Sequence, residues 1–397
     1  MNLLPEKWNV NPQHFWLRGE HPDEPVSFDP DLGLWNVYGY PEAVEILGDF
    51  KSFSSNTTRL LPTEVDESLN DGVLFQMDPP QHRKLRKLVS HAFSPKTVAN
   101  LEPRINRLAH ELLDKAAERD RLELVSDLAY PLPVIVIAEL LGIPGSDRDL
   151  FKAWVDRLFE STGQFSLVNH DEDQERALQT QLDVTKDMTD YLRGHVTERR
   201  QEPREDLLTG LVQAEVDGER LTDQQIVTFA NILLVAGHIT TTMLLGNTVL
   251  CLDAHPEAFA EVRANRSALP GVIEESLRFF TPFTAAARAT ATEVEIAGVR
   301  VPADQMLMVW VAAANRDGRQ FADPDVFDPS RDPNPHLGFG RGMHFCLGAS
   351  LARVEARIAL NVLLDRFPTL HTAPEEPPAF VVSPEMSGVH TLPLLTG

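Results

Sequence analysis

The sequence predicts a mainly α-helical protein with a small β portion, and three observations support this fold class. The run from Gln224 to Leu252 contains no Asp, Glu, Lys or Arg, which is typical of a helix buried on all sides. Segments 96–120 and 181–201 carry apolar residues near helical spacing with charged faces. Two late segments, 294–301 and 305–314, read as strands, the first joined by an Ala-Gly turn. We expect one domain over residues 1–397.

The charge and cysteine content limit the possible functions. The chain has 36 basic and 59 acidic residues and a net charge of −23, which argues against nucleic-acid binding. Two cysteines, Cys251 and Cys346, cannot build a disulfide framework, so a reducing compartment, most simply the cytoplasm, is expected. The N-terminal residues contain no basic segment followed by an apolar core, so we expect no signal peptide or anchor. We also expect a monomer.

The length of this charge-free run suits either a membrane-spanning helix or a buried core helix. Asn231, His238, Asn247 and five threonines interrupt it. Thr222 and Gln225 form a capping box at its start, as in helices of globular proteins. We therefore predict a long helix through the centre of the protein and no membrane partner.

The segment "HLGFGRGMHFCLG", residues 336–348, places Cys346 in a glycine-rich loop before a helix. A thiolate is a soft, strong donor suited to haem iron. Gly340, Gly342 and Gly348 allow close backbone approach, a helix start favours the thiolate, and Phe339 can shield the sulfur. The alternative is a buried, inert cysteine beside a turn.

Phe339, Gly342, His344, Cys346 and Gly348 fill the spacing Phe-x-x-Gly-x-His-x-Cys-x-Gly. This pattern resembles the haem-thiolate signature of the cytochrome P-450 family. The resemblance implies that Cys346 is the axial iron ligand of haem b (iron protoporphyrin IX). It also implies the family's triangular, mainly α fold, with haem between the long central helix and the helix after the cysteine loop. It extends roughly from residue 79 to the C-terminus.

Further motifs match the family in the same order. Glu275 and Arg278 lie three apart on one predicted helix and are similar to the family's Glu-x-x-Arg structural pair, with Arg331 as a third member. Two haem propionates need paired donors inside a protein. By resemblance these donors are His82, Arg86, Arg288 and His344.

The centre of the charge-free run resembles the family's oxygen-side motif. Ala236, Gly237, Thr240 and Thr241 occupy it, and the resemblance implies that Thr240 guides proton delivery. A threonine bonded to the preceding helical turn is the structural alternative. The family's acid position is Ile239, which cannot carry a proton. A water chain ending on Thr240, a substrate hydroxyl, or the use of peroxide would each explain this departure.

The resemblance implies a pocket for a large hydrophobic molecule, and the sequence shows no arginine cluster there for a carboxylate. Macrolides and other polyketides are the favoured substrates, as in antibiotic biosynthesis, with steroids, terpenoids and fatty acids as alternatives. Electrons are expected from ferredoxin reductase and ferredoxin, the latter docking on Arg83, Lys84, Lys87 and Arg341. A peroxide-driven peroxygenase and a non-catalytic haem sensor are the other functions considered. The pocket residues expected are Leu234, Val235, Ile239, Phe283, Ala285, Ala286 and Met386, with further contributions from 57–75 and 159–168.

Overall fold

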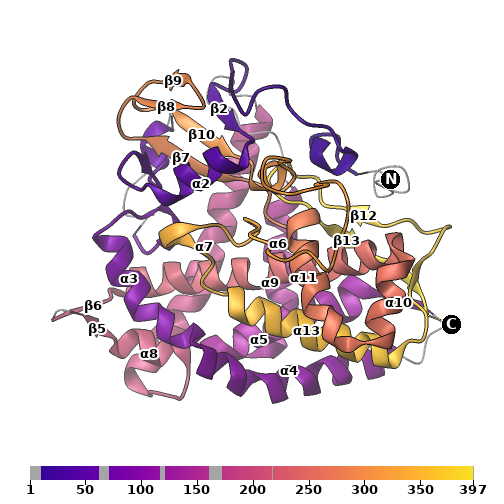
Figure 1. Ribbon diagram of the computed structural model, residues 1–397. Coiled ribbons are helices and arrows are strands. Elements are labelled where there is room, and N and C mark those ends of the chain that lie inside the picture. The colour runs from indigo at the N-terminus through magenta and orange to yellow at the C-terminus, as the bar shows by residue number, and fades with distance from the viewer. Residues whose placement is uncertain (1–9, 62–70, 117–120, 161–171, 217, 397) are drawn as a thin grey trace.

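The computed structural model describes residues 10–61, 71–116, 121–160, 172–216 and 218–396. The fold is mostly helical, as predicted, with small sheets at its edges (Figure 1). Its helices are α2 (Tyr40–Gly48), α3 (Gln81–Val89), α4 (Pro95–Ala116), α5 (Pro131–Leu141), α6 (Arg148–Glu160), α7 (Glu172–Gln201), α8 (Leu207–Gln213), α9 (Asp223–Ala254), α10 (Pro256–Ala264), α11 (Leu269–Phe279), α12 (Val311–Ala314) and α13 (Ala349–Arg366).

Helix α9 is the predicted central helix. The Thr222 hydroxyl accepts from the N–H of Gln225, and the Gln225 side chain accepts from the N–H of Thr222, which completes the predicted capping box. Among the described residues α9 is the one helix long and apolar enough to cross a membrane, and more than half of its most apolar part is buried inside the protein. It packs against α5, α7, α11 and α13, and Figure 1 shows it running through the middle of the helical layer.

The main sheet combines strands from both ends of the chain. Its order is β1 (Val26–Asp29), β2 (Leu34–Val37), β10 (Met306–Val309), β7 (Ala286–Thr290) and β3 (Phe53–Ser54). Strands β1, β2 and β3 lie in the first part of the chain, where no strand was predicted. The remaining strands pair locally or near the C-terminus: β4 (Arg121–Glu123), β5 (Glu215–Val216), β6 (Glu219–Arg220), β8 (Val294–Ile296), β9 (Val299–Val301), β11 (His371–Thr372), β12 (Ala379–Phe380), β13 (Val389–Thr391) and β14 (Pro393–Leu395).

Of the two late segments predicted as strands, 294–301 forms as expected and 305–314 does so only in part. Strands β8 and β9 form the expected hairpin, and both turn residues, Ala297 and Gly298, have positive φ (50° and 79°), as a two-residue turn that matches strand twist requires. Segment 305–314 is a strand only as far as Val309. Trp310 leaves the extended conformation (ψ 83°), and Val311–Ala314 form the short helix α12, which suits the helix propensity of its three alanines.

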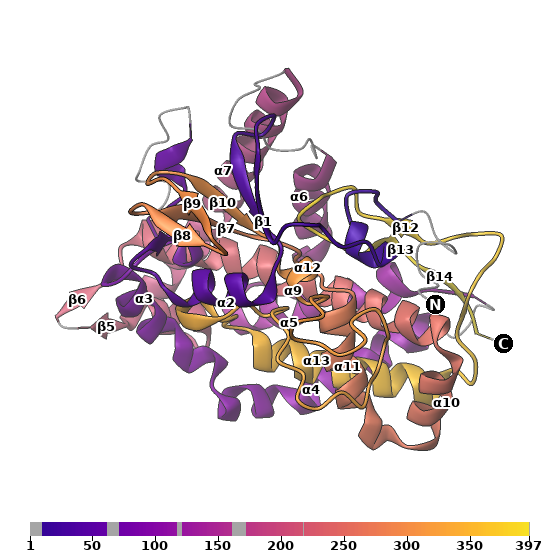
Figure 2. The same cartoon turned by 45° about the horizontal axis from the view of Figure 1, so that its top comes forward.

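The helices below the sheet surround the cysteine loop. Helix α13 follows that loop and packs along α4, α9 and α11. Figure 2 shows α13 between α4 and α11, with the loop leading into it from the sheet side. The predicted helical segments 96–120 and 181–201 correspond to α4 and the second part of α7. This packing fixes the position of Cys346 relative to α9.

Candidate functional site

The cysteine loop is held by backbone contacts that need two of its glycines. Gly340 and Gly342 have φ of 69° and 70°, and a Cβ at Gly342 would lie 2.6 Å from the carbonyl oxygen of Leu47. Any side chain at Gly342 would therefore force α2 away. The N–H of Cys346 donates to the carbonyl of Phe339 (2.8 Å), which closes the loop. Gly348 differs, because a Cβ there would meet no protein atom within 4 Å, so open space borders it.

The Cys346 thiol is solvent accessible, whereas Cys251 is buried. The surroundings of Cys346 have opposing effects on the pKa of its thiol. Desolvation raises the pKa, and the N–H groups of Gly348 and Ala349 together with the Arg86 and Arg353 guanidinium groups oppose that rise. The N–H groups belong to the start of α13, as predicted from the sequence. The thiol therefore has donors that stabilise a thiolate and an open side toward a ligand.

A network that sequence reasoning missed fixes the loop to its neighbours. Glu274 accepts from Arg353 of α13 (2.6 and 2.8 Å) and contacts Nε2 of His336 (3.1 Å). Arg353 also lies 4.5 Å from the centre of the Phe339 ring. Burial alone would raise the pKa of Glu274, but Arg353 and His336 lower it to about 2. This ion-pair network ties α11, α13 and the start of the cysteine loop together.

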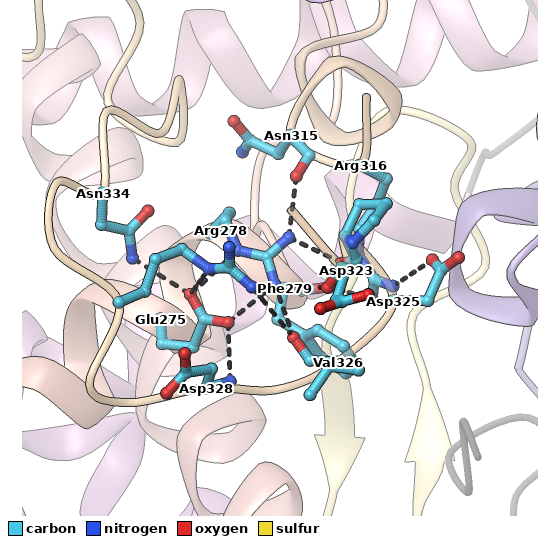
Figure 3. Close-up of polar contacts among 12 residues, drawn as sticks. Glu275, Arg278, Phe279, Asn315, Arg316, Asp323, Asp325, Val326, Asp328 and Asn334 are labelled. Atoms are coloured by element: carbon cyan, nitrogen blue, oxygen red, sulfur yellow. Dashed lines mark hydrogen bonds and ion pairs between the residues drawn. The ribbon is translucent and has the colours of Figure 1, made fainter. Parts of the chain in front are cut away.

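Figure 3 shows the predicted structural pair and its partners. Glu275 and Arg278 are fully buried and form a two-armed ion pair (2.7 and 2.9 Å). Arg331 is 3.5 Å from Glu275, so the predicted third member is present. Arg278 also donates to the backbone carbonyls of Asn315, Pro324 and Val326, while Glu275 accepts from the N–H of Asp328 and from Asn334. The pair therefore anchors the segment before the cysteine loop to α11.

The four predicted propionate donors converge on one region. The rings of His82 (α3) and His344 (cysteine loop) lie 4.3 Å apart between centroids. Arg86 follows His82 by four residues on α3 and donates to the carbonyl of Phe345 (2.8 Å). Arg288 lies on β7 and is 7% exposed. A further contact was missed from the sequence, because His344 Nε2 bonds to the hydroxyl of Ser55 (2.8 Å), whose N–H donates to Asp78.

These donors lack the anionic partners that their chemistry requires. Both ring nitrogens of His82 are buried without a hydrogen-bond partner, and within the described residues neither Arg86 nor Arg288 forms an ion pair with an acidic side chain. Burial lowers the pKa of Arg288 to about 10, and the charge of Asp78 offsets this only in part. Burial, together with the positive charges of Arg288 and Arg86, lowers the pKa of His344 to about 3. Two carboxylates placed here would supply those partners. The residues present therefore fit the propionates of a haem.

The oxygen-side motif lies in the middle of α9. Thr240 donates its hydroxyl hydrogen to the carbonyl of Ala236 (3.0 Å), and Thr241 donates to that of Gly237 (3.3 Å). The helix is continuous through this motif. Ala236 is exposed and Thr240 half-buried, whereas Thr241 and Ile239 are buried. Thr240 and Ala236 thus form the accessible part of the motif.

The predicted pocket residues belong to several hydrophobic clusters. Ile239 packs with Met243, Val235, Val381 and Met386, and an isolated bridge joins Phe283 to Met386. Leu234 lies in the main core, Ala285 packs with Leu34, Met306 and Met308, and Ala286 packs in the sheet cluster. Segments 62–70 and 161–168, which we expected to contribute, lie outside the described residues.

Comparisons with known proteins agree with this geometry. A family model described as cytochrome P-450 matches residues 33–395. The chain is 44% identical to cyclomarin C epoxidase CymV of Salinispora arenicola over 89% of this chain and 88% of that protein. It is 40% identical to the erythromycin C-12 hydroxylase of Saccharopolyspora erythraea over 96% and 94% of the two chains. The crystal structure of HmtN, a post-tailoring hydroxylase involved in himastatin biosynthesis, matches 99% of both chains with a TM-score of 0.88 and 54% identity.

Proposed function

Because this chain belongs to the cytochrome P-450 family, we propose that it inserts one oxygen atom from O2 into a large hydrophobic secondary metabolite, a polyketide or macrolide, by hydroxylation or epoxidation. Membership makes the protein a haem-thiolate monooxygenase. Its similarity to an epoxidase and to hydroxylases that are named for natural products supports this type of reaction and substrate. We place the enzyme in the cytoplasm.

The observation that carries the proposal is the set of donors beside the exposed Cys346 that form no ion pair with an acidic side chain of the described residues. When bound, the haem supplies the iron that activates oxygen. Cys346 would hold this iron, while His82, Arg86, Arg288 and His344 would hold the propionates. The backbone N–H groups at the start of α13 stabilise the thiolate charge. Phe339 and Arg353 cover the loop and keep its sulfur in place.

Thr240 is the proposed proton-transfer residue. Its hydroxyl donates to Ala236, which leaves the lone pairs of Oγ1 available to accept a hydrogen bond from a water molecule and so to position it. Ile239 is buried and cannot relay a proton, so water and the Thr240 hydroxyl carry this role together.

The substrate class is tested by a spin-state titration of the purified ferric protein. The panel holds macrolides, steroids, terpenoids and fatty acids, and each is scored for displacement of the water on iron. We expect the strongest low-to-high-spin shift with macrolides, because the residues proposed for the pocket are apolar, small or hydroxylated. A stronger shift with another class would replace the substrate assignment and leave the monooxygenase assignment intact.

Ferredoxin and a ferredoxin reductase are the proposed electron donors, using NAD(P)H. Arg83 and Lys87 of α3 and Arg341 of the cysteine loop are exposed, whereas Lys84 forms an ion pair with Glu219 of β6. We therefore assign docking to Arg83, Lys87 and Arg341 and give Lys84 a smaller part. Lys87→Glu should slow reduction by an acidic [2Fe–2S] ferredoxin, more at low salt than at high salt. Lys186→Glu on α7 is the matched control and should have no effect.

A peroxide-driven peroxygenase is the second candidate, because Ile239 occupies the acid position. It would use the same cofactor and substrate but no electron donors. Product formed with hydrogen peroxide at a rate that exceeds the rate with ferredoxin, reductase and O2 would favour this candidate.

A further inference from the structure

A cavity of about 470 Å³ lies beside α9, away from Ala236 and Thr240. Five parts of the fold enclose it: the end of α4, the turn between β4 and α5, helix α6, the middle of α9 and the C-terminal segment that contains β13. From α9 it is lined by His238, Ile239, Thr242 and Met243. Thr240 is two residues from His238 and points about 200° away around the helix. The cavity therefore faces the side of α9 opposite Thr240 at His238, and of its lining residues Met243 lies nearest the side of Thr240.

His238 gives this cavity a specific polar atom. Its side chain is 0% exposed, and its Nδ1 bonds to the carbonyl oxygen of Leu234, so Nδ1 carries the hydrogen. Desolvation lowers the pKa of His238 to about 4, so the ring is neutral at pH 7. Nε2 is then an acceptor, and it is buried without a hydrogen-bond partner. A buried acceptor of this kind needs a donor.

The neighbouring groups of the chain do not supply that donor. The hydroxyl of Thr242 donates to the carbonyl of Ala129 (2.9 Å), and that of Tyr130 donates to the carbonyl of Arg148 (3.3 Å). The Tyr130 ring meets His238 edge-on, with 5.5 Å between centroids. Lys152 forms an ion pair with Asp156. None of these side chains donates to Nε2, so a molecule in the cavity can supply the donor.

The shape and walls of the cavity favour more than a single water molecule. A water occupies about 30 Å³ of liquid volume, and ordered water needs two to four polar partners. The lining includes Ile239, Met243, Val381 and Val389, which provide none, and the hydroxyls of Thr242 and Tyr130 already donate to backbone carbonyls. The charged groups are Lys115, Glu123, Asp127, Arg148, Asp149, Lys152 and Asp156, and they come from α4, the β4–α5 turn and α6. The inner end thus matches an apolar body with one donor group.

We propose that this cavity binds a small apolar molecule with one hydroxyl group, an alcohol or a phenol, whose O–H donates to Nε2 of His238. This cavity shares Ile239 with the proposed substrate pocket, because Ile239 and Met243 line the cavity and also pack against Val235 and Met386. An occupant therefore presses on residues next to the oxygen-side motif. It acts as an effector ligand and is not oxidised.

The test compares 4-ethylphenol with 4-ethylanisole, its methyl ether, which lacks the donor. Both are titrated by calorimetry into the haem-loaded ferrous protein under carbon monoxide, which blocks turnover and ligation of iron by the probes. We expect the phenol to bind at least about tenfold more tightly than the ether, because the ether leaves Nε2 unsatisfied. In the same samples, the ¹⁵N resonance of His238 Nε2 should shift with the phenol alone.

His238→Phe should remove the preference for the phenol. His255→Phe is the matched control, because His255 also bonds to the carbonyl four residues earlier (Cys251, 2.8 Å) but lies at the end of α9, outside the cavity. This control should keep the preference. Equal affinities for phenol and ether, a preference that survives in His238→Phe, or no binding at all would each overturn the proposal, and the last result would mean that water fills the cavity. If His238→Phe does not fold, the ¹⁵N shift in the unaltered protein decides.

Discussion

Glu355 on α13 should make the protein less stable as the pH rises, and replacing it with glutamine should remove this effect. Its side chain is 2% exposed, its Oε2 has no hydrogen-bond partner, and burial alone raises its pKa from 4.5 to about 8. Between these two values the folded protein keeps a proton that the unfolded chain has released. The free energy of unfolding therefore falls as the pH rises from about 4.5 to about 8.

The size of the effect follows from the pKa change. The raised pKa of Glu355 lowers the free energy of unfolding by about 5 kcal/mol above pH 8 but by only about 2 kcal/mol at pH 6. The free energy of unfolding of the Glu355→Gln protein, relative to that of the unaltered protein, should therefore rise by about 3 kcal/mol from pH 6 to pH 8.5. For a chain of 397 residues, this corresponds to about 4 °C in the melting midpoint.

The assay is thermal unfolding of both haem-loaded proteins at the two pH values, followed by circular dichroism. At each pH we take the difference in melting midpoint between the two proteins, and we compare this difference at the two pH values. Other carboxylates titrate in both proteins, so their effect cancels. Glu375→Gln changes an exposed glutamate and is the control. Its melting midpoint should change with pH as that of the unaltered protein does. A difference for Glu355→Gln that stays constant with pH would refute the reasoning, since it would mean that a partner satisfies the buried carboxyl group.

Three other substitutions test the proposed site. Cys346→Ser should abolish the thiolate-type spectrum of the reduced carbon-monoxide complex while haem stays bound through the propionate donors; an unchanged spectrum would remove Cys346 as the ligand. Thr240→Ala should divert reducing equivalents to hydrogen peroxide, measured as product formed per NAD(P)H consumed, whereas Thr240→Ser should retain most coupling because the hydroxyl remains; equal coupling in all three proteins would make Thr240 structural. Glu275→Gln should cost about 3–5 kcal/mol of stability, because it leaves the fully buried Arg278 without its anionic partner; a melting midpoint within error of the unaltered protein would contradict the anchoring role.

The sequence predicted the parts of the site that depend on local spacing. Glu275 and Arg278 are neighbours on any helix, and the capping box of α9 lies within four residues. The turn between β8 and β9 was equally local. These features need only a helix or a two-residue turn to form, so periodicity and residue type were sufficient.

Contacts between distant segments could not be predicted from local spacing. The contacts of Glu274 with His336 and Arg353 span 62 and 79 positions, and the Ser55–His344 bond spans 289. Nothing in the local pattern around Glu274 distinguishes it from Glu275, and only the packing of α11 against α13 does so. Strands β1 and β2 were missed because each has four residues, too few for alternation to stand out, and because no two-residue turn joins them as one joins β8 to β9.

The main sheet also has a consequence for synthesis of the chain. Strand β2 pairs in parallel with β10, and the indole of Trp310 donates to Asn36, 274 positions earlier. At about 5–20 residues per second, the ribosome needs tens of seconds to make that partner strand. During this time Leu34 and Val37, fully covered in the finished protein, have no native neighbour on the β10 side. The nascent chain therefore carries an early hairpin whose apolar side chains gain their native β10 neighbour only when translation nears its end.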